Sequence, residues 1–197
     1  MKKLGGIKQV GTLKLGPIEI PMTIYQQDGK VRVEYLYNKE GKPAVSIFDG
    51  KNAVKTTPWD TETIIPLTGE ELVKIKEQAA VTGILANYEE LNYSVRSILP
   101  HEKDPKLTVV LMLRDDQVSE MKVILDKKSM VSEIELERFA GKALQKSRIE
   151  YSEYRDFGGV NLAMKTEELI GNRVLTSSII NSVETGFDFD KSIFEKP

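Results

Sequence analysis

The chain has 197 residues, of which 40% are hydrophobic and 29% are charged, and its formal net charge is -2 at pH 7. These values are typical of one soluble domain with a substantial core, and the nearly balanced charge gives no electrostatic reason to expect nucleic acid or anionic lipid headgroups as partners. The sequence contains no cysteine, which excludes disulfides, thiolate metal sites and thiol catalysis. No apolar run approaches the roughly 18 residues that a membrane-spanning helix needs.

The first sixty residues predict short strands joined by tight turns. Asp28-Gly29 supplies the positive φ angles of a two-residue hairpin turn between two strand-like segments. In the second segment Val31 and Val33 share one face, whereas Arg32 points to the other. The strands expected here are 7–15, 18–26, 30–37, 44–48 and 52–57, followed by a loop that holds Trp59.

Residues 67–90 are the only long segment with helical periodicity. Thr68 followed by Glu71 is a capping box, in which each side chain is expected to satisfy a backbone amide at the helix start. Gly83 is expected to break or bend the helix. The apolar stripe consists of Leu72, Ile75, Ala79, Ile84 and Leu85.

After the helix the sequence again predicts short strands, one of which carries a ladder of glutamates. Glu133, Glu135 and Glu137 alternate with apolar residues and therefore share one face. The following strand carries Lys146 and Arg148, which favours charge pairs between the two strands. The strands expected in this half are 91–99, 107–113, 118–125, 130–139, 147–155, 160–167 and 174–182.

Successive strands joined by short turns predict an antiparallel meander, and a sheet of about ten strands tends to curl. The expected fold class is therefore mainly β (α+β). We expect a strongly curved antiparallel sheet, or half-barrel, of about ten strands with a helical lid over residues 68–90. The whole chain, 1–197, is expected to form this single domain.

The residues that could carry out chemistry favour structural roles. No GxSxG, HExxH, P-loop or dinucleotide-binding pattern is present. His101 is the only histidine, so a metal site would need carboxylates alone, and a surface loop is the better interpretation. Asp115 and Asp116 fit a hairpin tip, and the glutamate ladder fits a solvated face. The sequence therefore predicts no enzyme, no metal and no cofactor.

Arg32 allows two interpretations. It interrupts a strand of apolar residues, on the face opposite Val31 and Val33. It is either an exposed arginine of the strand ladder or a guanidinium that donates to carbonyls of the helical segment and holds that segment closed. Arginine suits the second role because its planar group makes several hydrogen bonds and does not lose its charge.

Several segments, taken in order, resemble one known family. They are Gly5-Gly6, PMTIYQQDGKVRVE, IFDGKNAV, TPWDTETIIPLTGEELVKIKEQAAVTGILANYEE, LDKKSMVSEIELERF, IEYSEYRDFGGVNLAMKTE and FDFDKSIFEKP. Their order and spacing resemble the outer-membrane lipoprotein-sorting family, which includes the periplasmic lipoprotein carrier. The resemblance implies a curved sheet under a helical lid, an apolar cavity that receives acyl chains, and a lid-locking arginine at Arg32. It also implies a mature protein of the periplasm or cell envelope, whose signal peptide has been removed.

The expected function is that of a periplasmic carrier or binding protein that holds acyl chains of lipoproteins or other lipids, with envelope proteins as donor and acceptor. Two alternatives stay open: an envelope protein-binding or sensor module of the same fold without lipid transfer, and a helix that packs permanently on the sheet without a functional cavity. The predicted cavity and lid residues are Ile24, Arg32, Val33, Leu72, Ile75, Ile84, Leu85, Val109, Leu111, Val123 and Ile134.

Overall fold

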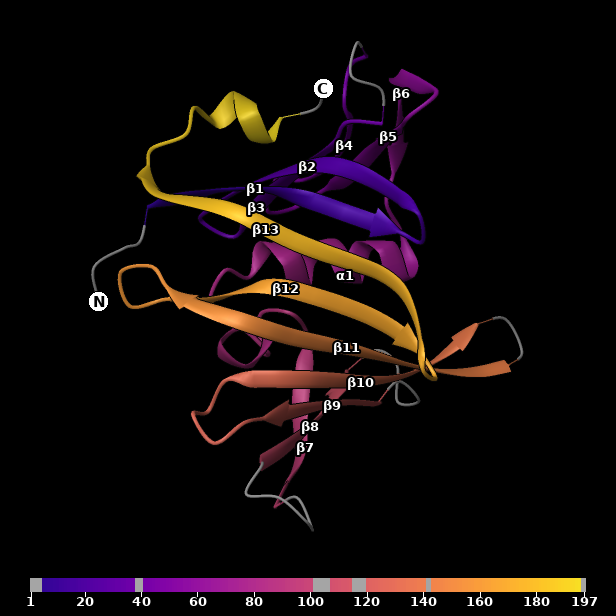
Figure 1. Ribbon diagram of the computed structural model, residues 1–197, viewed down its shortest axis with the longest axis vertical. Coiled ribbons are helices and arrows are strands. Elements are labelled where there is room, and N and C mark those ends of the chain that lie inside the picture. The colour runs from indigo at the N-terminus through magenta and orange to yellow at the C-terminus, as the bar shows by residue number, and fades with distance from the viewer. Residues whose placement is uncertain (1–4, 38–40, 101–106, 115–119, 141–142, 196–197) are drawn as a thin grey trace. The chain divides into compact units, whose positions relative to one another are not determined.

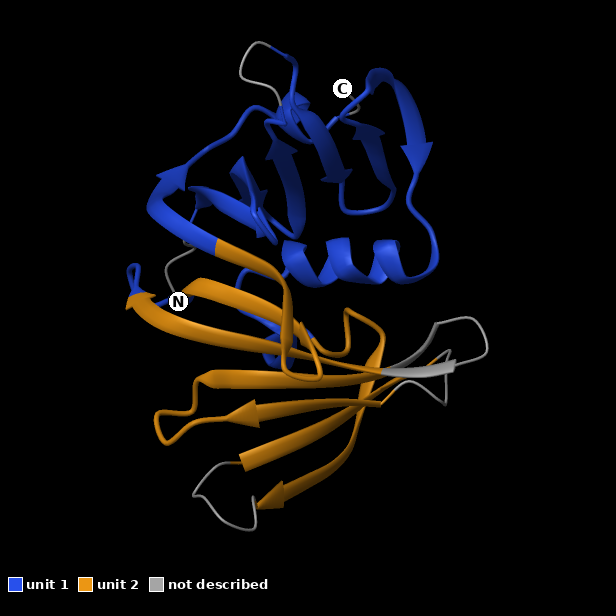
Figure 2. Ribbon diagram, turned by 45° about the vertical axis from the view of Figure 1, so that its right-hand side comes forward, with its two compact units in different colours: residues 1–87, 156–162, 179–197 blue, residues 88–155, 163–178 orange. Residues whose placement is uncertain are grey.

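A computed structural model describes residues 5–37, 41–100, 107–114, 120–140 and 143–195. These residues form thirteen strands in one antiparallel sheet, one α-helix and two short 3₁₀ helices (Figure 1). The backbone contacts divide the chain into two compact units (Figure 2). Unit 1 contains residues 1–87, 156–162 and 179–197, and unit 2 contains residues 88–155 and 163–178.

The bounds of the elements follow the predicted strands closely. Before the helix lie β1 (Gly6–Leu15), β2 (Ile18–Gln27), β3 (Lys30–Tyr35), β4 (Ala44–Phe48), β5 (Ala53–Thr57) and β6 (Asp60–Pro66). The helical elements are α1 (Gly69–Ala79), η1 (Ile84–Ala86) and, near the end of the chain, η2 (Lys191–Phe194). The remaining strands are β7 (Tyr93–Pro100), β8 (Leu107–Leu113), β9 (Glu120–Leu125), β10 (Val131–Ala140), β11 (Ala143–Asp156), β12 (Asn161–Ile170) and β13 (Arg173–Phe187).

The strand order is β6-β5-β4-β3-β2-β1-β13-β12-β11-β10-β9-β8-β7. The chain therefore begins in the middle of the sheet, runs outward to β6, passes through α1 and η1 to β7, and returns to the middle at β13. Among the described strands, β6 and β7 end the sheet, which is not closed into a barrel. The predicted antiparallel sheet with a helix midway is confirmed.

The expected number of about ten strands is wrong, because the sheet has thirteen. The segment expected to be a loop after Trp59 is strand β6, in which Ile65 pairs with Lys55. Almost every residue of β6 is exposed, as befits an edge strand whose sequence is polar and ends in Pro66. Such a strand has no buried face, and it therefore lacks the alternation by which sequence patterns reveal strands.

The helical segment is shorter than predicted. It begins at the expected place, with Thr68 as N-cap, but the Thr68 side chain makes no capping hydrogen bond. Glu71 pairs with Lys55 of β5 instead. The capping-box bonds are therefore wrong, although the helix start is right. The helix ends at Ala79, and Gly83 breaks the segment at a φ of 86° before η1.

In unit 1, α1 lies against β3 and β4 (Figure 1). The face that it covers includes Val31 and Val33, which are 0% and 1% exposed. Ile24 of β2 pairs with Val33, so it shares this face. Ile75 and Ala79 are the buried residues of the helix. As the alternation predicted, Arg32 lies on the opposite face of β3.

Unit 2 gathers a set of buried aliphatic residues on one face of its strands. Val123 pairs with both Val109 and Ile134, so these buried side chains form one row across β8, β9 and β10. Leu111 and Met121 form a second buried pair on the same face. The opposite face of β8 and β9 is mixed, because it carries the buried Val110 and Ile124 as well as Lys122.

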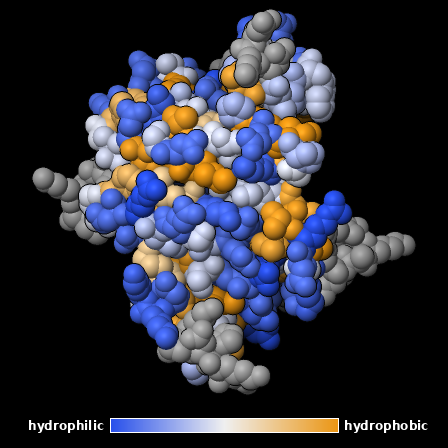
Figure 3. Space-filling model, viewed as in Figure 1, coloured by the Kyte–Doolittle hydropathy of each residue, from blue (hydrophilic) through white to orange (hydrophobic). Residues whose placement is uncertain are grey.

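The charged face of unit 2 confirms the predicted cross-strand pairing. Lys146 Nζ lies 2.5 Å from Glu137 Oε1, and Arg148 Nε lies 3.8 Å from Glu133 Oε1. Arg148 Nη2 also lies 2.9 Å from Glu150 Oε1. On the surface seen in Figure 3, hydrophilic side chains alternate with hydrophobic patches. The Lys146–Glu137 pair is accessible to solvent, as expected for a solvated face, whereas the Nε atom of Arg148 is buried and makes no hydrogen bond.

Candidate ligand-binding face

The predicted cavity residues fall into two groups, one in each unit. In unit 1, Ile24 and Val33 lie on the face that α1 covers. Of the four predicted lid residues, Ile75 and Ile84 are buried, and Leu72 and Leu85 are half-buried. In unit 2, the face described above brings together Val109, Leu111, Val123 and Ile134. Their assignment to a ligand site stays a prediction. His101, Asp115 and Asp116 lie outside the described residues.

A pair of buried glutamines shares the face of unit 1 with these aliphatic residues. Gln9 pairs with Ile24, and Gln26 pairs with Val31, which places both side chains under α1. Gln9 Nε2 donates to Gln26 Oε1 at 2.7 Å, and the two residues are 9% and 7% exposed. Gln26 Nε2 in turn donates to the backbone carbonyl of Gln78 at 2.5 Å.

This hydrogen bond completes the end of α1. The last carbonyls of an α-helix have no partner within the helix and need one elsewhere. The amides of Ala80, Val81 and Gly83 donate to the carbonyls of Glu77, Ala79 and Ala80. The carbonyl of Gln78 accepts from the Gln26 side chain. The glutamine pair therefore fastens the last turn of the helix to the sheet.

Gln9 and Gln26 are not among the residues predicted from the sequence. A signal was present, because the alternation of IEIPMTIYQQ puts Gln26 on the same face as Ile24. A polar residue at an inward position needs a buried partner. The partners lie 17 and 52 residues away in the sequence, and strand patterns do not reveal contacts at that range.

Arg32 contacts the end of the chain, not α1. Its Nε donates to Glu34 Oε1 at 2.6 Å, and its Nη1 donates to the carbonyl of Ile193, in η2, at 3.3 Å. Its side chain is 16% exposed. The expectation that Arg32 donates to carbonyls of the 68–90 segment is therefore wrong. The guanidinium does donate to a carbonyl of a helical segment. That segment is η2, which lies on the same face of β3 as Arg32.

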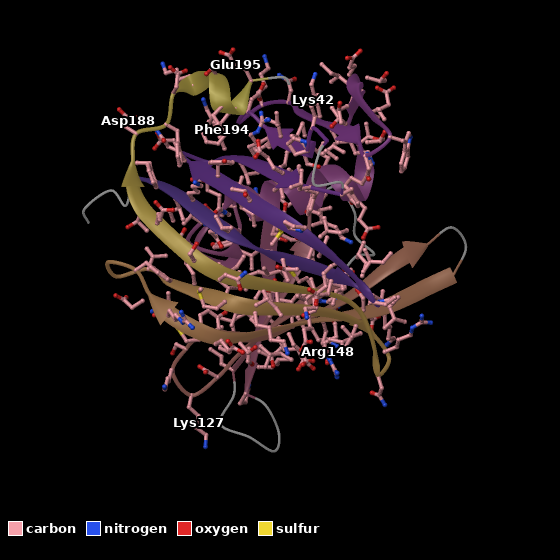
Figure 4. All side chains as sticks on the ribbon, turned by 45° about the horizontal axis from the view of Figure 1, so that its top comes forward. Lys42, Lys127, Arg148, Asp188, Phe194 and Glu195 are labelled. Carbon is pink, nitrogen blue, oxygen red and sulfur yellow. The ribbon has the colours of Figure 1, made fainter. Side chains whose placement is uncertain are left out.

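Aromatic side chains fasten the same terminal segment. The Phe189 ring stacks on Phe187 with centroids 4.9 Å apart and meets Tyr25 edge-on at 5.7 Å. The Phe189 amide also donates to Gln27 Oε1 at 2.8 Å. Phe194 is 3% exposed and lies on the side of η2 toward the strands of unit 1 (Figure 4). Residues 187–194 are thus packed onto β2 and β3 opposite α1.

The described residues offer little for catalysis by metals. They contain no group of three or more histidine, cysteine, aspartate or glutamate side chains placed to hold a metal ion. Nor does any helix in the described ranges have the length and apolarity to cross a membrane.

Solved structures share this architecture over nearly the whole chain. An outer-membrane lipoprotein-sorting protein domain from Vibrio parahaemolyticus matches with a TM-score of 0.68 at 11% identity, over 98% of this chain and 90% of that one. A LolA-superfamily protein from Nitrosomonas europaea matches with a TM-score of 0.65 at 11% identity, over 100% and 92%. This chain has the LolA-like fold. The resemblance that the sequence motifs suggested is confirmed at the level of the fold.

A third structure extends the LolA-like set. A DUF1329 family protein from Desulfovibrio piger matches with a TM-score of 0.55 at 9% identity, over 98% of this chain and 91% of that one. No family model matches the sequence, and no curated protein matches it either. At such low identities the LolA-like fold is shared, and the function has to be argued from this chain's own residues.

Replacing Arg32 with leucine tests which segment it holds in this LolA-like fold. We expect faster amide exchange for residues 191–195, by about tenfold, because a hydrogen bond from a charged group is worth about 1.5 kcal/mol or more. Exchange in α1 should be unchanged. Hydrogen-exchange mass spectrometry measures both segments. Lys14→Leu, which removes a cation from the exposed pair with Glu19, is the control. Faster amide exchange in α1 of Arg32→Leu would instead show that Arg32 holds α1 in place.

The ionisation of Tyr35 should make the stability of the fold depend on pH. It lies on the α1 face of β3, where burial, helped by the neighbouring Tyr37, raises its pKa to about 12. In the unfolded chain it deprotonates near pH 10. Between about pH 10 and pH 12 the unfolded state alone releases this proton, so stability present below pH 10 is lost as the pH rises. The free energy of unfolding should fall by about 1.4 kcal/mol per pH unit from this residue. In urea unfolding at several pH values, the free energy of unfolding should fall less steeply with pH for Tyr35→Phe than for the wild type.

Proposed function

We propose that this protein binds acyl chains of lipoproteins or other lipids on the apolar face that α1 covers, and that it acts as a carrier in the periplasm or cell envelope. The observation that carries the proposal is the small buried contact of α1. Of its eleven residues, Ile75 and Ala79 are buried, whereas the sheet beneath it presents fully buried aliphatic side chains. The apolar face is thus covered by a helix that buries two side chains and is otherwise fastened to the sheet by the Gln26–Gln78 hydrogen bond and the Lys55–Glu71 pair.

The energies favour displacement of the helix by an acyl chain. Burying an isoleucine side chain stabilises by about 3 kcal/mol at most, and alanine adds little. Ten buried methylenes contribute about 8 kcal/mol, which corresponds to micromolar affinity before ordering costs are subtracted. Ligand and α1 compete for contact with Ile24 and Val33. A long acyl chain is therefore expected to displace α1, and a short one is not.

The proposed ligand-contacting residues are those predicted from the sequence, without Arg32 as the lock. On the sheet of unit 1 they are Ile24 and Val33, and on the lid they are Leu72, Ile75, Ile84 and Leu85. In unit 2, the apolar face with Val109, Leu111, Val123 and Ile134 is a second, separate candidate for apolar ligands. The mechanism is non-enzymatic: cargo is held by apolar burial and released when α1 returns to the sheet, which requires only reversible binding.

A second candidate function rests on the edge strand β7. Its Val95, Ile98 and Leu99 are 42%, 60% and 50% exposed, and β7 ends the described sheet. An edge strand with exposed aliphatic side chains can add an extended polypeptide as a further strand. This observation favours an envelope protein-binding module that recognises polypeptide without transferring lipid.

Titration with a dansyl-labelled undecanoic acid tests the first function. We expect saturable binding with a dissociation constant of about 0.1–1 mM, since about 8 kcal/mol of burial is offset by about 3 kcal/mol for displacing α1, and displacement by unlabelled palmitate. Dansyl fluorescence is the readout, because Trp59 is 85% exposed and gives no burial signal. Leu99→Lys on β7 should leave this binding unchanged. No saturable binding by wild type would reject the carrier function. Binding of extended peptides that is lost in Leu99→Lys would support the second function.

A further inference from the structure

The Gln9–Gln26 pair is an unexpected feature of an apolar binding face. Its neighbours in register are Ile24 and Val31, and apolar side chains there would pack without any need for partners. A buried amide group is costly unless its hydrogen bonds are made. Gln26 meets this need from both ends, because its oxygen accepts from Gln9 and its nitrogen donates to the Gln78 carbonyl.

Movement of α1 away from the sheet would take the Gln78 carbonyl from this nitrogen. Gln9 would still hold the Gln26 oxygen at 2.7 Å, so the amide stays oriented with its N–H toward the space that the helix vacates. A hydrocarbon chain filling that space offers no acceptor, which leaves a buried donor unsatisfied. A carboxylate, ester or amide oxygen on the ligand would accept this hydrogen bond in place of Gln78.

We propose that Gln26, oriented by Gln9, is a ligand-selecting donor for which the end of α1 and an acceptor oxygen on the acyl ligand compete. The proposal deepens the proposed function and rests on it. It specifies the ligand class as a fatty acid, acyl ester or acyl amide whose carbonyl or carboxylate end lies beside Gln26, with its hydrocarbon beside Ile24. A plain hydrocarbon is bound less well than its size alone would predict.

The test compares two probes on the whole protein. Dansyl-undecanoic acid carries a carboxylate, and diphenylhexatriene is a hydrocarbon without any acceptor. In Gln26→Met, which nearly keeps the side-chain shape, α1 loses its hydrogen bond and diphenylhexatriene should bind more tightly. The carboxylate probe gains from the loosened helix but loses its donor. The ratio of the two affinities should therefore shift by about three- to tenfold toward the hydrocarbon, as for loss of one hydrogen bond.

Gln27→Met is the matched control, because Gln27 is adjacent but bonds Phe189 and Asp188 on the opposite face. It should leave the affinity ratio unchanged. Gln9→Met keeps Gln26 and removes the bond that orients it, so a smaller shift of the ratio in the same direction is expected. This second variant decides the question if Gln26→Met does not fold.

An equal change in both affinities for a folded Gln26→Met would overturn the proposal, because a purely structural residue acts on both probes alike. An unchanged ratio in Gln9→Met, where Gln26→Met does not fold, would overturn it as well. Failure of the proposed function is distinguishable, because wild type would then bind neither probe.

Discussion

Gly11→Ala is expected to lower the free energy of unfolding by about 3 kcal/mol, a large effect for one added methyl group. A Cβ at Gly11 would lie 2.2 Å from the backbone carbonyl oxygen of Ile179. That oxygen belongs to β13, the strand beside β1 in the sheet. Backbone atoms in a paired strand have no rotamer by which to move away, so the strands themselves must separate.

Urea unfolding followed by circular dichroism measures this effect. The matched control is Thr12→Ala at the next position of β1, which removes atoms instead of adding them and should cost less than 1 kcal/mol or so. A Gly11→Ala protein as stable as the control would mean that β1 and β13 are not in close contact at this position. The expected loss therefore tests the pairing that joins the first and last strands.

Ile75→Ala is expected to release α1 without unfolding the sheet. Truncating a buried isoleucine costs about 2–4 kcal/mol, and Ile75 is the one large side chain that α1 buries. If α1 is a removable lid, the cost falls on helix docking. Exchange of the 69–79 amides should then rise by tenfold or more, and dansyl-undecanoic acid should bind at least about tenfold more tightly.

The control for this prediction is Val123→Ala, which truncates a fully buried residue of unit 2. It should lower the free energy of unfolding without raising exchange in α1. Ile75→Ala could instead lower global stability and leave ligand affinity unchanged. That outcome would identify α1 as permanent core, the alternative that the sequence pattern alone allows.

The sequence predicts local structure well where a single signal dominates. Asp28-Gly29 correctly predicts the turn between β2 and β3. The alternation of side chains correctly predicts that Val33 and Arg32 lie on opposite faces of β3. A strand pattern says which side a residue faces. It does not say which segment covers that side.

That limit explains the error at Arg32. Two helical segments pack on β3, and only α1 is long enough to show helical periodicity in the sequence. η2 has four residues, too few for a periodic signal, yet it is the segment that covers the face of Arg32. The predicted capping-box bonds are wrong for a related reason, because Glu71 pairs with Lys55 of β5. Each error comes from a long-range partner that competes with a local one.

In the proposed mechanism, an acyl ligand takes the place of α1 on the sheet. Hydrogen-exchange mass spectrometry of wild-type protein, with and without saturating dansyl-undecanoic acid, tests it most directly. We expect the ligand to increase exchange of the 69–79 amides, whereas exchange of residues 187–195, held by Arg32 and by the contacts of Phe189 and Phe194, should stay unchanged. Bound ligand with α1 exchanging as slowly as in the free protein would contradict it.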